Sequence, residues 1–385
     1  MLYFDANATV PMTHAARLAW NEAQDTAWTN PSSPTRTSAK VRARIEEARG
    51  LIADLLGIDS SGLVFCSGAT EAANIIIASC ARGNPQGHVL CSSMEHACVR
   101  ESLKLHFPGR VRFFNPTLPV SDFEQTLTGM QKNGGSPCLV ITIAANNETG
   151  TILPWIDYAG ICRHSGVPFF SDMAQWIGKM PLQGLRDVDF FCSSGHKFGA
   201  PKGIGILKVS GKFWEVTGQR GGGQEHGIRS GTGDYPAIHA LARALESAAH
   251  WDGQELLARQ TQKQSWIQKL KERIPGVSIF GESLPGLWNT IAFAPPHGSR
   301  TEWIIELEKR GFLIGSGSAC SSAHTGSHVL DALGVDPAIA ARALRVSGMR
   351  DHRPEDWQAL LNAIQDTAAG FVHNQSGLSE VIEID

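Results

Sequence analysis

The sequence has no apolar run that approaches the roughly 18 residues of a membrane-spanning helix. It also lacks an excess of charge, and its net charge of −3 gives no sign of a nucleic-acid or membrane surface. Residues Met1 to Asp5 lack the basic and apolar regions of a signal peptide. We therefore expect a soluble cytoplasmic protein that binds neither membranes nor nucleic acids directly.

The eight cysteines show no C-x-x-C spacing, so neither a disulfide framework nor a zinc site is indicated, and no metal is expected. Four of them lie in or beside apolar, strand-like runs, where a thiol usually behaves as a small hydrophobic side chain. These four are Cys66, Cys91, Cys138 and Cys192. Cys320 has a different setting and is considered separately.

The 385 residues, 42% of them hydrophobic, are enough for a large core and two domains. Strand-like and helix-like segments alternate from about residue 40 to 250, which predicts an α/β layer sandwich with a mostly parallel sheet. A helical period predicts one amphipathic helix over 40–56. Strands are expected near Val64, Val89, Val111, Leu139, Phe169, Phe190 and Ile206.

After a long helical stretch predicted over 237–273, the pattern changes to that of a smaller α+β unit. Its expected strands lie at 290–293 and 312–314, and its expected helices lie at 301–309 and 354–371. Residues from about 374 are polar, and we expect them to be loosely held. We place the large domain at 14–252 and the small one at 1–13 and 253–385.

An apolar run at 187–192 reads as a buried strand and is followed by small polar residues and Lys197. An amine at the mouth of a sheet can form a Schiff base with an aldehyde, such as pyridoxal phosphate, if it is partly desolvated. Most lysines are solvated surface charges, so this hypothesis depends on the surrounding residues.

A second apolar run, 167–172, ends on Asp172, which lies 25 residues before Lys197. In a parallel sheet both residues would lie at the carboxyl edge, where such sheets bind ligands. An aspartate there can keep a pyridinium nitrogen protonated, and Gln175 could reach the ring hydroxyl. Taken alone, Asp172 would be interpreted as a helix cap or a turn residue.

A third strand, 64–66, leads into the small residues 67–74. Backbone N–H groups at such a junction suit a phosphate, and Thr70 would add a hydroxyl, although ordinary helix capping gives the same pattern. Together, the strand ends before Thr70, Asp172 and Lys197 predict a pyridoxal phosphate site.

Residues 315–326 contain almost nothing that could form a core, and their small side chains predict a flexible surface segment. Cys320 is the only nucleophile on this segment. A thiol there could approach a bound substrate, accept an atom and move away. The alternative is a tolerated surface cysteine.

With these residues assembled, the chain resembles the cysteine desulfurases of the NifS/IscS type, in the class V aminotransferase group of fold type I. The motifs that carry the resemblance run nearly end to end: residues 3–9, 30–33, 67–71, 95–96, 146–150, 172–175, 194–197, 229–232 and 317–320. The resemblance implies a fold-type I transferase with a three-layer α/β/α large domain and a smaller α+β domain that carries the Cys320 loop. It also implies a homodimer.

The implied activity converts L-cysteine to L-alanine and passes the sulfur to Cys320 as a persulfide, and then to an acceptor protein. Lys197 would form the Schiff base and move protons. His96 would stack on the cofactor ring and assist proton transfer, although without the family it would be a capping or loop histidine. Thr232 would reach the partner subunit's cofactor.

The residues that the resemblance implies for cofactor binding are Ala69, Thr70, His96, Asn147, Asp172, Gln175, Ser194, His196, Lys197 and Thr232. Those implied for the substrate are Asn30, Asn147 and Arg345. A planar guanidinium suits a bidentate contact with the substrate carboxylate, and the alternative for Arg345 is a surface salt bridge that contributes little.

Three segments depart from the family pattern: Pro34–Ser38, Glu225–Gly227 and the segment after Cys320, which is slightly short. A selenocysteine lyase, another C–S lyase or an aminotransferase of the same fold remains an alternative activity. Cys320 argues against transamination, which needs no nucleophilic thiol. A second alternative is a degenerate member of the family kept as a scaffold.

Overall fold

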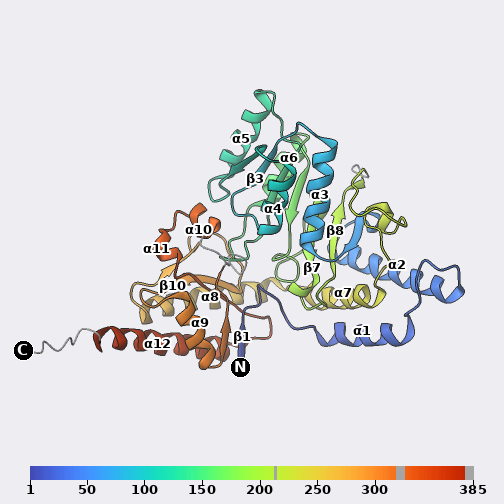
Figure 1. The fold of residues 1–385 in the computed structure, drawn as a ribbon. Coiled ribbons are helices and arrows are strands. Elements are labelled where there is room, and N and C mark those ends of the chain that lie inside the picture. Colours follow the sequence, from blue (N-terminus) through green and yellow to red (C-terminus); the bar gives the residue numbers. More distant parts are fainter. Residues whose placement is uncertain (212–214, 318–325, 378–385) are drawn as a thin grey trace, which may run out of the picture. The chain divides into compact units, whose positions relative to one another are not determined.

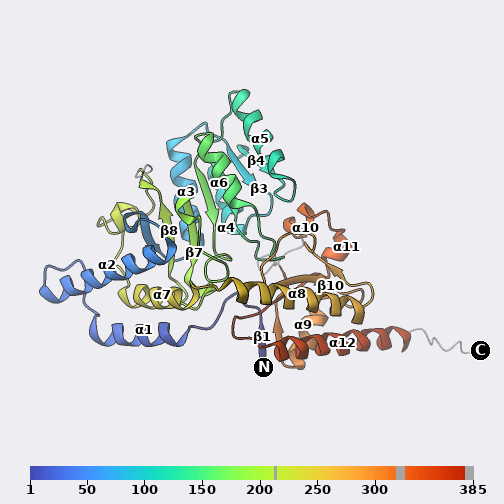
Figure 2. The same ribbon diagram turned by 180° about the vertical axis from the view of Figure 1, so that it is seen from behind.

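The computed structural model describes residues 1–211, 215–317 and 326–377. The chain divides into two compact units (Figures 1 and 2). The larger unit consists of 9–146 and 152–251, and the smaller unit consists of 1–8, 147–151 and 252–385. Within the described ranges, no helix combines the length and the apolar character that crossing a membrane requires.

The larger unit is built on a seven-stranded sheet of order β2-β8-β7-β6-β5-β3-β4. β8 is antiparallel to both of its neighbours, and the other neighbouring pairs are parallel. The strands are β2 (Leu63–Cys66), β3 (Val89–Ser92), β4 (Val111–Phe114), β5 (Leu139–Ile143), β6 (Phe169–Asp172), β7 (Phe190–Ser194) and β8 (Gly205–Val209). The seven expected strands and the mostly parallel sheet are therefore confirmed.

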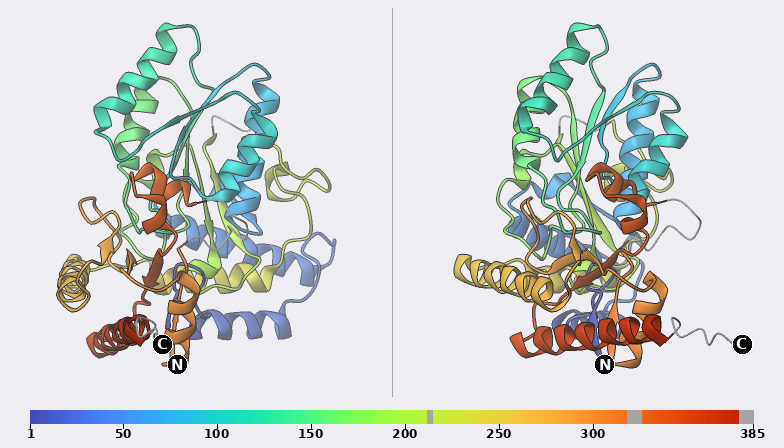
Figure 3. Two further views of the ribbon diagram at one scale, coloured as in Figure 1. Left: turned by 60° about the vertical axis from the view of Figure 1, so that its left-hand side comes forward. Right: turned by 90° about the vertical axis from the view of Figure 1, so that its left-hand side faces the viewer.

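Helices cover both faces of this sheet. α3 (Ala69–Gly83) and α4 (Ala97–His106) lie on one face, while α5 (Val120–Lys132) and α6 (Trp155–His164) lie on the other (Figure 3). The described helices that remain in this unit pack together, with α7 in contact with both others. They are α1 (His14–Thr26), α2 (Arg36–Leu56) and α7 (Tyr235–Ala248). The expected three-layer arrangement is confirmed.

α2 begins four residues before the predicted start at residue 40. The Thr35 hydroxyl accepts a hydrogen bond from the Ser38 N–H at 3.2 Å, which is a standard N-cap. Gly57 ends the helix with a left-handed φ of 65°. The departure from the family pattern at 34–38 thus contains the residue that caps α2.

The smaller unit has two small sheets. β1 pairs in parallel with β11, and β10 lies between β9 and β12 with antiparallel pairing. The strands are β1 (Leu2–Phe4), β9 (Ser278–Ile279), β10 (Thr290–Ala294), β11 (Phe312–Ile314) and β12 (Leu344–Ser347), and the helices are α8 (Gly253–Arg273), α9 (Arg300–Lys309), α10 (His328–Ala332), α11 (Pro337–Ala340) and α12 (Pro354–Gly377). Phe4, Trp266 and Trp357 pack in the core of this unit.

The prediction of one helical stretch over 237–273 is wrong, because α7 ends at Ala248 and α8 begins at Gly253. Asp252 has an extended backbone, and its carboxylate accepts the Gln254 N–H at 3.1 Å, so it starts a new helix. At the other end, α12 continues to Gly377, past residue 374 where loose structure was expected.

The observed division of the chain also differs from the sequence-based boundaries. Residues 9–13 belong to the larger unit, where Val10 N donates to the His196 carbonyl at 3.0 Å. Residues 147–151 belong to the smaller unit, where the Gly150 carbonyl accepts the Leu287 N–H at 2.8 Å. Backbone pairing to distant segments decides both assignments.

Candidate active site

Three strand ends of the predicted site meet at one edge of the large sheet. β6 ends at Asp172, and its parallel neighbour β7 leads directly into Lys197. β2 runs parallel to β7 because β8, between them, is antiparallel to both. The carboxyl ends of the strands before Thr70, Asp172 and Lys197 therefore lie on the same edge, as the sequence predicts.

Gly205, the first residue of β8, holds two of these strand ends close together. It is paired with Cys66 at the end of β2 and with Ser194 at the end of β7. A Cβ atom at this position would lie 2.5 Å from both the Gly68 Cα and the Ser193 carbonyl oxygen. Only glycine allows this approach, because the neighbouring atoms are backbone.

The junction between β2 and α3 forms a cradle of backbone N–H groups. Gly68 has φ 146°, a conformation that favours glycine, and a Cβ there would lie 3.0 Å from the Ser194 Oγ. That Oγ accepts the Ala69 N–H at 2.9 Å. The next amides, of Thr70 and Glu71, are in the first turn of α3, where no intrahelical carbonyl is available. The cradle and the helix dipole both favour an anion.

Asp172 is 3% exposed, and its Oδ1 accepts the Ala174 N–H at 2.8 Å. His96 caps α4, since its Nδ1 accepts the Cys98 N–H at 3.2 Å. One ligand atom each of His96, Cys98 and Asp172 lie within 4.8 Å of one another. The capping and turn interpretations are thus correct for His96 and Asp172, and the same contacts fix both side chains beside each other.

Burial raises the pKa of the Cys98 thiol, and the negative charges of Asp172 and Glu95 add to this effect. A metal ligand must be a thiolate, so a protonated Cys98 is a poor ligand. The three residues fit a carboxylate that faces a protonated ring nitrogen better than they fit a metal ion.

Lys197 is half-buried in the short turn Gly195–Lys197 after β7. The Nδ1 of its neighbour His196 lies 3.1 Å from the Thr9 Oγ1. Burial lowers the pKa of His196 to about 4, and the positive charges of Lys197, Lys202 and Lys179 contribute. His196 is therefore neutral near pH 7 and lies within a group of cationic side chains.

Gln175 is 2% exposed, and Lys179 is 5% exposed. The Lys179 ammonium donates a hydrogen bond to the Gln175 Oε1. Since an ammonium can only donate, this contact assigns the amide oxygen and leaves the Nε2 as the donating end of Gln175. Sequence reasoning assigned no role to Lys179, although its spacing of four residues from Gln175 is a usable signal.

Glu95, next to His96, is fully buried and was also given no role from the sequence. Its Oε1 accepts the Ile143 N–H. Burial raises the pKa of Glu95 to about 8, and the nearby Asp172 charge adds to the shift. Glu95 is therefore largely protonated at neutral pH.

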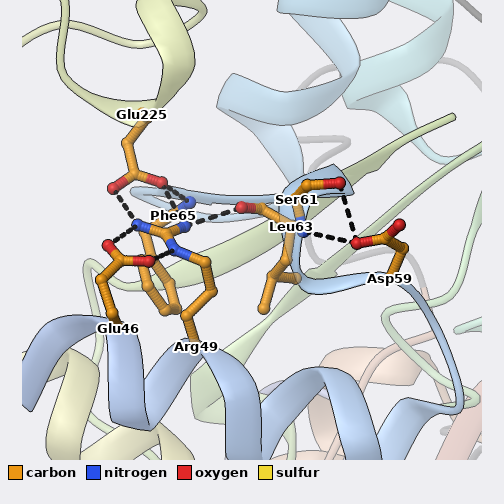
Figure 4. Close-up of polar contacts among 7 residues, drawn as sticks. All are labelled: Glu46, Arg49, Asp59, Ser61, Leu63, Phe65 and Glu225. Atoms are coloured by element: carbon orange, nitrogen blue, oxygen red, sulfur yellow. Dashed lines mark hydrogen bonds and ion pairs between the residues drawn. The ribbon is translucent and has the colours of Figure 1, made fainter. Parts of the chain in front are cut away.

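The segment 218–232, which carries Thr232, is fixed to α2 by a buried ion pair between Glu225 and Arg49 (Figure 4). It is also fixed to β2, because the Phe65 N–H donates a hydrogen bond to the Glu225 carboxylate at 2.7 Å. The Arg49 Nη1 and Nη2 each lie 2.8 Å from a carboxylate oxygen of Glu225. Arg49 also donates to Glu46 at 3.0 Å and to the Leu63 carbonyl at 2.7 Å, and its guanidinium lies over the Phe65 ring.

Figure 4 also shows the Asp59–Ser61 turn that precedes β2, in which the Asp59 carboxylate accepts the Ser61 N–H at 2.9 Å.

Glu225 and His226 have positive φ values of 49° and 58°, which non-glycine residues rarely adopt. The ion pair with Arg49 supplies the stabilisation that holds this turn. The second departure from the family pattern therefore lies in a strained turn.

The same segment is also attached to α3. The Arg229 Nε donates to the Glu71 Oε1 at 2.9 Å, and the other Glu71 oxygen accepts the Ser67 N–H. Thr232, three residues after Arg229, is exposed, as is Thr70. Residues 218–232 are thus anchored both to the phosphate cradle and to the strand that leads into it.

In the smaller unit, Arg345 on β12 is 2% exposed, so the alternative of a surface salt bridge is wrong. Its Nη2 lies 2.6 Å from the Asp5 carboxylate, and its Nη1 donates to the Asn147 and Gly317 carbonyls at 2.9 Å. The Nε has no hydrogen-bond partner among the described residues. Arg345 and Asn147 are therefore brought together, with part of the guanidinium still to be satisfied.

Two predicted residues are not joined to these groups. Asn30 belongs to the larger unit and is exposed, with its Oδ1 accepting the Ser32 N–H at 2.9 Å. Cys320 lies outside the described residues, so its proposed approach to the substrate stays a prediction.

The class-V aminotransferase family matches residues 2–360 of the chain. An IscS-like cysteine desulfurase of Mycobacterium tuberculosis is 32% identical over 358 residues, which cover 90% of this chain and 91% of that protein. The solved structure of a NifS-like protein has a TM-score of 0.84 and 27% identity, with coverage of 96% and 99%. That of SspA in complex with cysteine has a TM-score of 0.76 and 29% identity, with coverage of 90% and 98%.

Replacing Arg49 by methionine is expected to lower the free energy of unfolding by roughly 3 kcal/mol, because the buried Glu225 carboxylate loses its guanidinium partner. The double variant Arg49→Met/Glu225→Gln should recover part of the loss. Glu46→Gln is the matched control, since the Glu46 side chain is 57% exposed and its loss should cost less than about 1 kcal/mol. Denaturant unfolding measures all three, and an equal cost for Glu46→Gln would contradict the assignment.

The raised pKa of Glu95 predicts that stability falls as the pH rises toward about 8. In this range the unfolded chain has an ionised Glu95, whereas the folded protein keeps it protonated, so unfolding releases a proton. The expected slope is about 1.4 kcal/mol per pH unit. Glu95→Gln should flatten this slope in unfolding curves, and Glu124→Gln, at an exposed site, should not. Identical slopes for both variants would refute the prediction.

Proposed function

Because the chain belongs to the class-V aminotransferase family, we propose that it is a pyridoxal-phosphate-dependent cysteine desulfurase. It converts L-cysteine to L-alanine, moves the sulfur to Cys320 as a persulfide and passes it to an acceptor protein. The observation that carries the proposal is that the buried Asp172 carboxylate, the half-buried Lys197 amine and the anion cradle at Gly68 lie at the same edge of the sheet.

These residues fit pyridoxal phosphate group by group. The cradle at Gly68, which a Cβ would fill, suits the phosphate, with Thr70, Ser194 and His196 beside it. Asp172 suits the pyridine nitrogen, and Lys197 suits the aldehyde. When bound, the cofactor supplies an electron sink for the bond-breaking steps at the substrate α-carbon.

Asp172 serves as the buried carboxylate for the pyridine nitrogen, and the raised pKa of Glu95 keeps that second carboxyl protonated at neutral pH. The Nδ1 of His96 is occupied as a helix cap, so its neutral tautomer carries the proton on Nε2. That proton is available to the reacting groups. Lys197 takes the substrate α-proton once its amine is released.

Arg345 and Asn147 bind the substrate carboxylate in this proposal, and Asn30 contributes as the family resemblance implies. The Nε of Arg345 without a partner among the described residues supports this role, because a buried donor needs an acceptor. The Cys320 thiolate attacks the substrate sulfur, which forms the S–S bond of the persulfide and breaks the substrate C–S bond.

The partners follow from the same proposal. L-Cysteine is the substrate, and SspA, a structural relative, was solved with cysteine bound. We infer a homodimer in which Thr232 reaches the partner subunit's cofactor. The anchored segment 218–232 supports this inference, since a residue that serves a second subunit must be exposed and fixed. The cytoplasmic location stays a prediction.

Two variants separate the cofactor step from the sulfur step. Lys197→Ala should lose both the visible absorption band of the bound cofactor and the release of alanine. Cys320→Ala should keep the band but lower persulfide formation at least about 100-fold, because only the nucleophile is missing. Absorbance and trapping of labelled sulfur measure the two. Full sulfur transfer by Cys320→Ala would exclude the mechanism.

Lys179 is a positioning residue: it orients the Gln175 amide and should influence cofactor binding through that amide. Lys179→Met frees the amide to turn its oxygen toward the cofactor ring oxygen, so cofactor binding should weaken about tenfold and the visible band should shift. Lys179→Arg, which keeps the donor, should restore much of the binding. The exposed Lys132, on α5, provides the control variant Lys132→Met. Equal losses for Met and Arg at position 179 would show a role in packing alone.

A further inference from the structure

Two cysteines of the larger unit lie in contact away from the site described above. The Sγ atoms of Cys80 and Cys138 are 3.5 Å apart. Cys80 is on α3, and Cys138 is the residue before β5. Cys138 thus lies at the amino edge of the parallel strands, opposite to the edge that carries Asp172 and Lys197. The desulfurase activity proposed above leaves this pair without a role.

The surroundings of the pair leave space and access. Both thiols are partly exposed, whereas the five other cysteines of the described ranges are buried. Cys138 packs against the hydrophobic core, as expected of a small hydrophobic side chain, but it is only partly buried. A Cβ at Gly87 would lie 2.7 Å from the Cys138 Sγ, so glycine at this position makes room for the sulfur.

The two thiols are also chemically different. The Cys80 thiol donates a hydrogen bond to the Cys138 sulfur, which raises the pKa of Cys80 and lowers the pKa of Cys138. Arg110 adds positive charge near both sulfurs, and its Nη1 donates to the Gly87 carbonyl at 2.8 Å. A thiolate with a cation nearby is the reactive form of cysteine, so Cys138 is the nucleophile and Cys80 the resolving thiol.

We propose that Cys80 and Cys138 form a reversible redox modification site, which hydroperoxides oxidise to an intramolecular disulfide. In the first step, the Cys138 thiolate attacks the peroxide, its sulfur gains an oxygen to become a sulfenic acid, and water leaves after one proton is taken up. In the second step, the Cys80 sulfur attacks the sulfenic sulfur, the S–S bond forms, and a second water leaves with the Cys80 proton. Two electrons pass from the two sulfurs to the peroxide.

Bond formation requires the sulfurs to approach from 3.5 Å to about 2.05 Å, which is within the reach of side-chain rotation. The bond would join α3 to the start of β5 across 58 positions of sequence. Because α3 carries the phosphate cradle at its other end, the disulfide would tether the helix on which cofactor binding depends. We expect the oxidised protein to unfold at a higher temperature.

The test uses the full-length protein with Cys320→Ala, so that only the remaining thiols react with hydrogen peroxide. The expected product is lighter by two hydrogen atoms, contains a peptide linked through Cys80 and Cys138, and returns to the thiol form with dithiothreitol. Cys80→Ser and Cys138→Ser should each abolish the link, and Cys162→Ser, at a buried cysteine, should not. Arg110→Gln should slow the reaction several-fold.

Two results would overturn the proposal. One is that both thiols are still alkylated in full after peroxide treatment. The other is that Cys138 reaches the sulfinic state as fast with Cys80 present as in Cys80→Ser, since a resolving thiol must prevent this. The readouts are mass and linkage, so they do not depend on the desulfurase activity.

Discussion

The approach of β2 and β7 at the carboxyl edge of the sheet is the constraint on which the site depends. The first residue of β8 is paired with both strands, and backbone atoms surround the place where its side chain would be. Glycine at 205 lets the cradle before α3 lie beside the strand that leads to Lys197. A single larger residue there would separate the anion site from the amine.

Burial and neighbouring charges together set which side chains of this site are charged. Glu95 and Asp172 are both buried, and burial together with the nearby Asp172 charge raises the pKa of Glu95 to about 8. Burial also lowers the pKa of His196, and the positive charges of Lys197, Lys202 and Lys179 add to this shift. The sheet edge therefore combines two buried carboxyl groups with a neutral imidazole among cationic side chains.

Much of this arrangement follows from local sequence patterns. Apolar runs that end in polar residues predict the strands before Asp172 and Lys197. A strand buried in a parallel sheet is a continuous apolar run, and polar residues begin where the strand ends. The break between α7 and α8 was missed, since a helical period continues across Asp252 and only the cap geometry reveals the new start. The resemblance to cysteine desulfurases supplied the roles of Arg345 and Thr232, which no local pattern indicates.

The sequence by itself determined the elements, the mostly parallel sheet and the residues that approach its carboxyl edge, because these depend on hydrophobic period and on residue type along short segments. The tertiary structure alone decided which distant groups touch. Examples are Arg49 with Glu225, Lys179 with the amide of Gln175, and Cys80 with Cys138. Charge states and reactivity depend on burial and on neighbours within a few ångströms, and packing alone sets both.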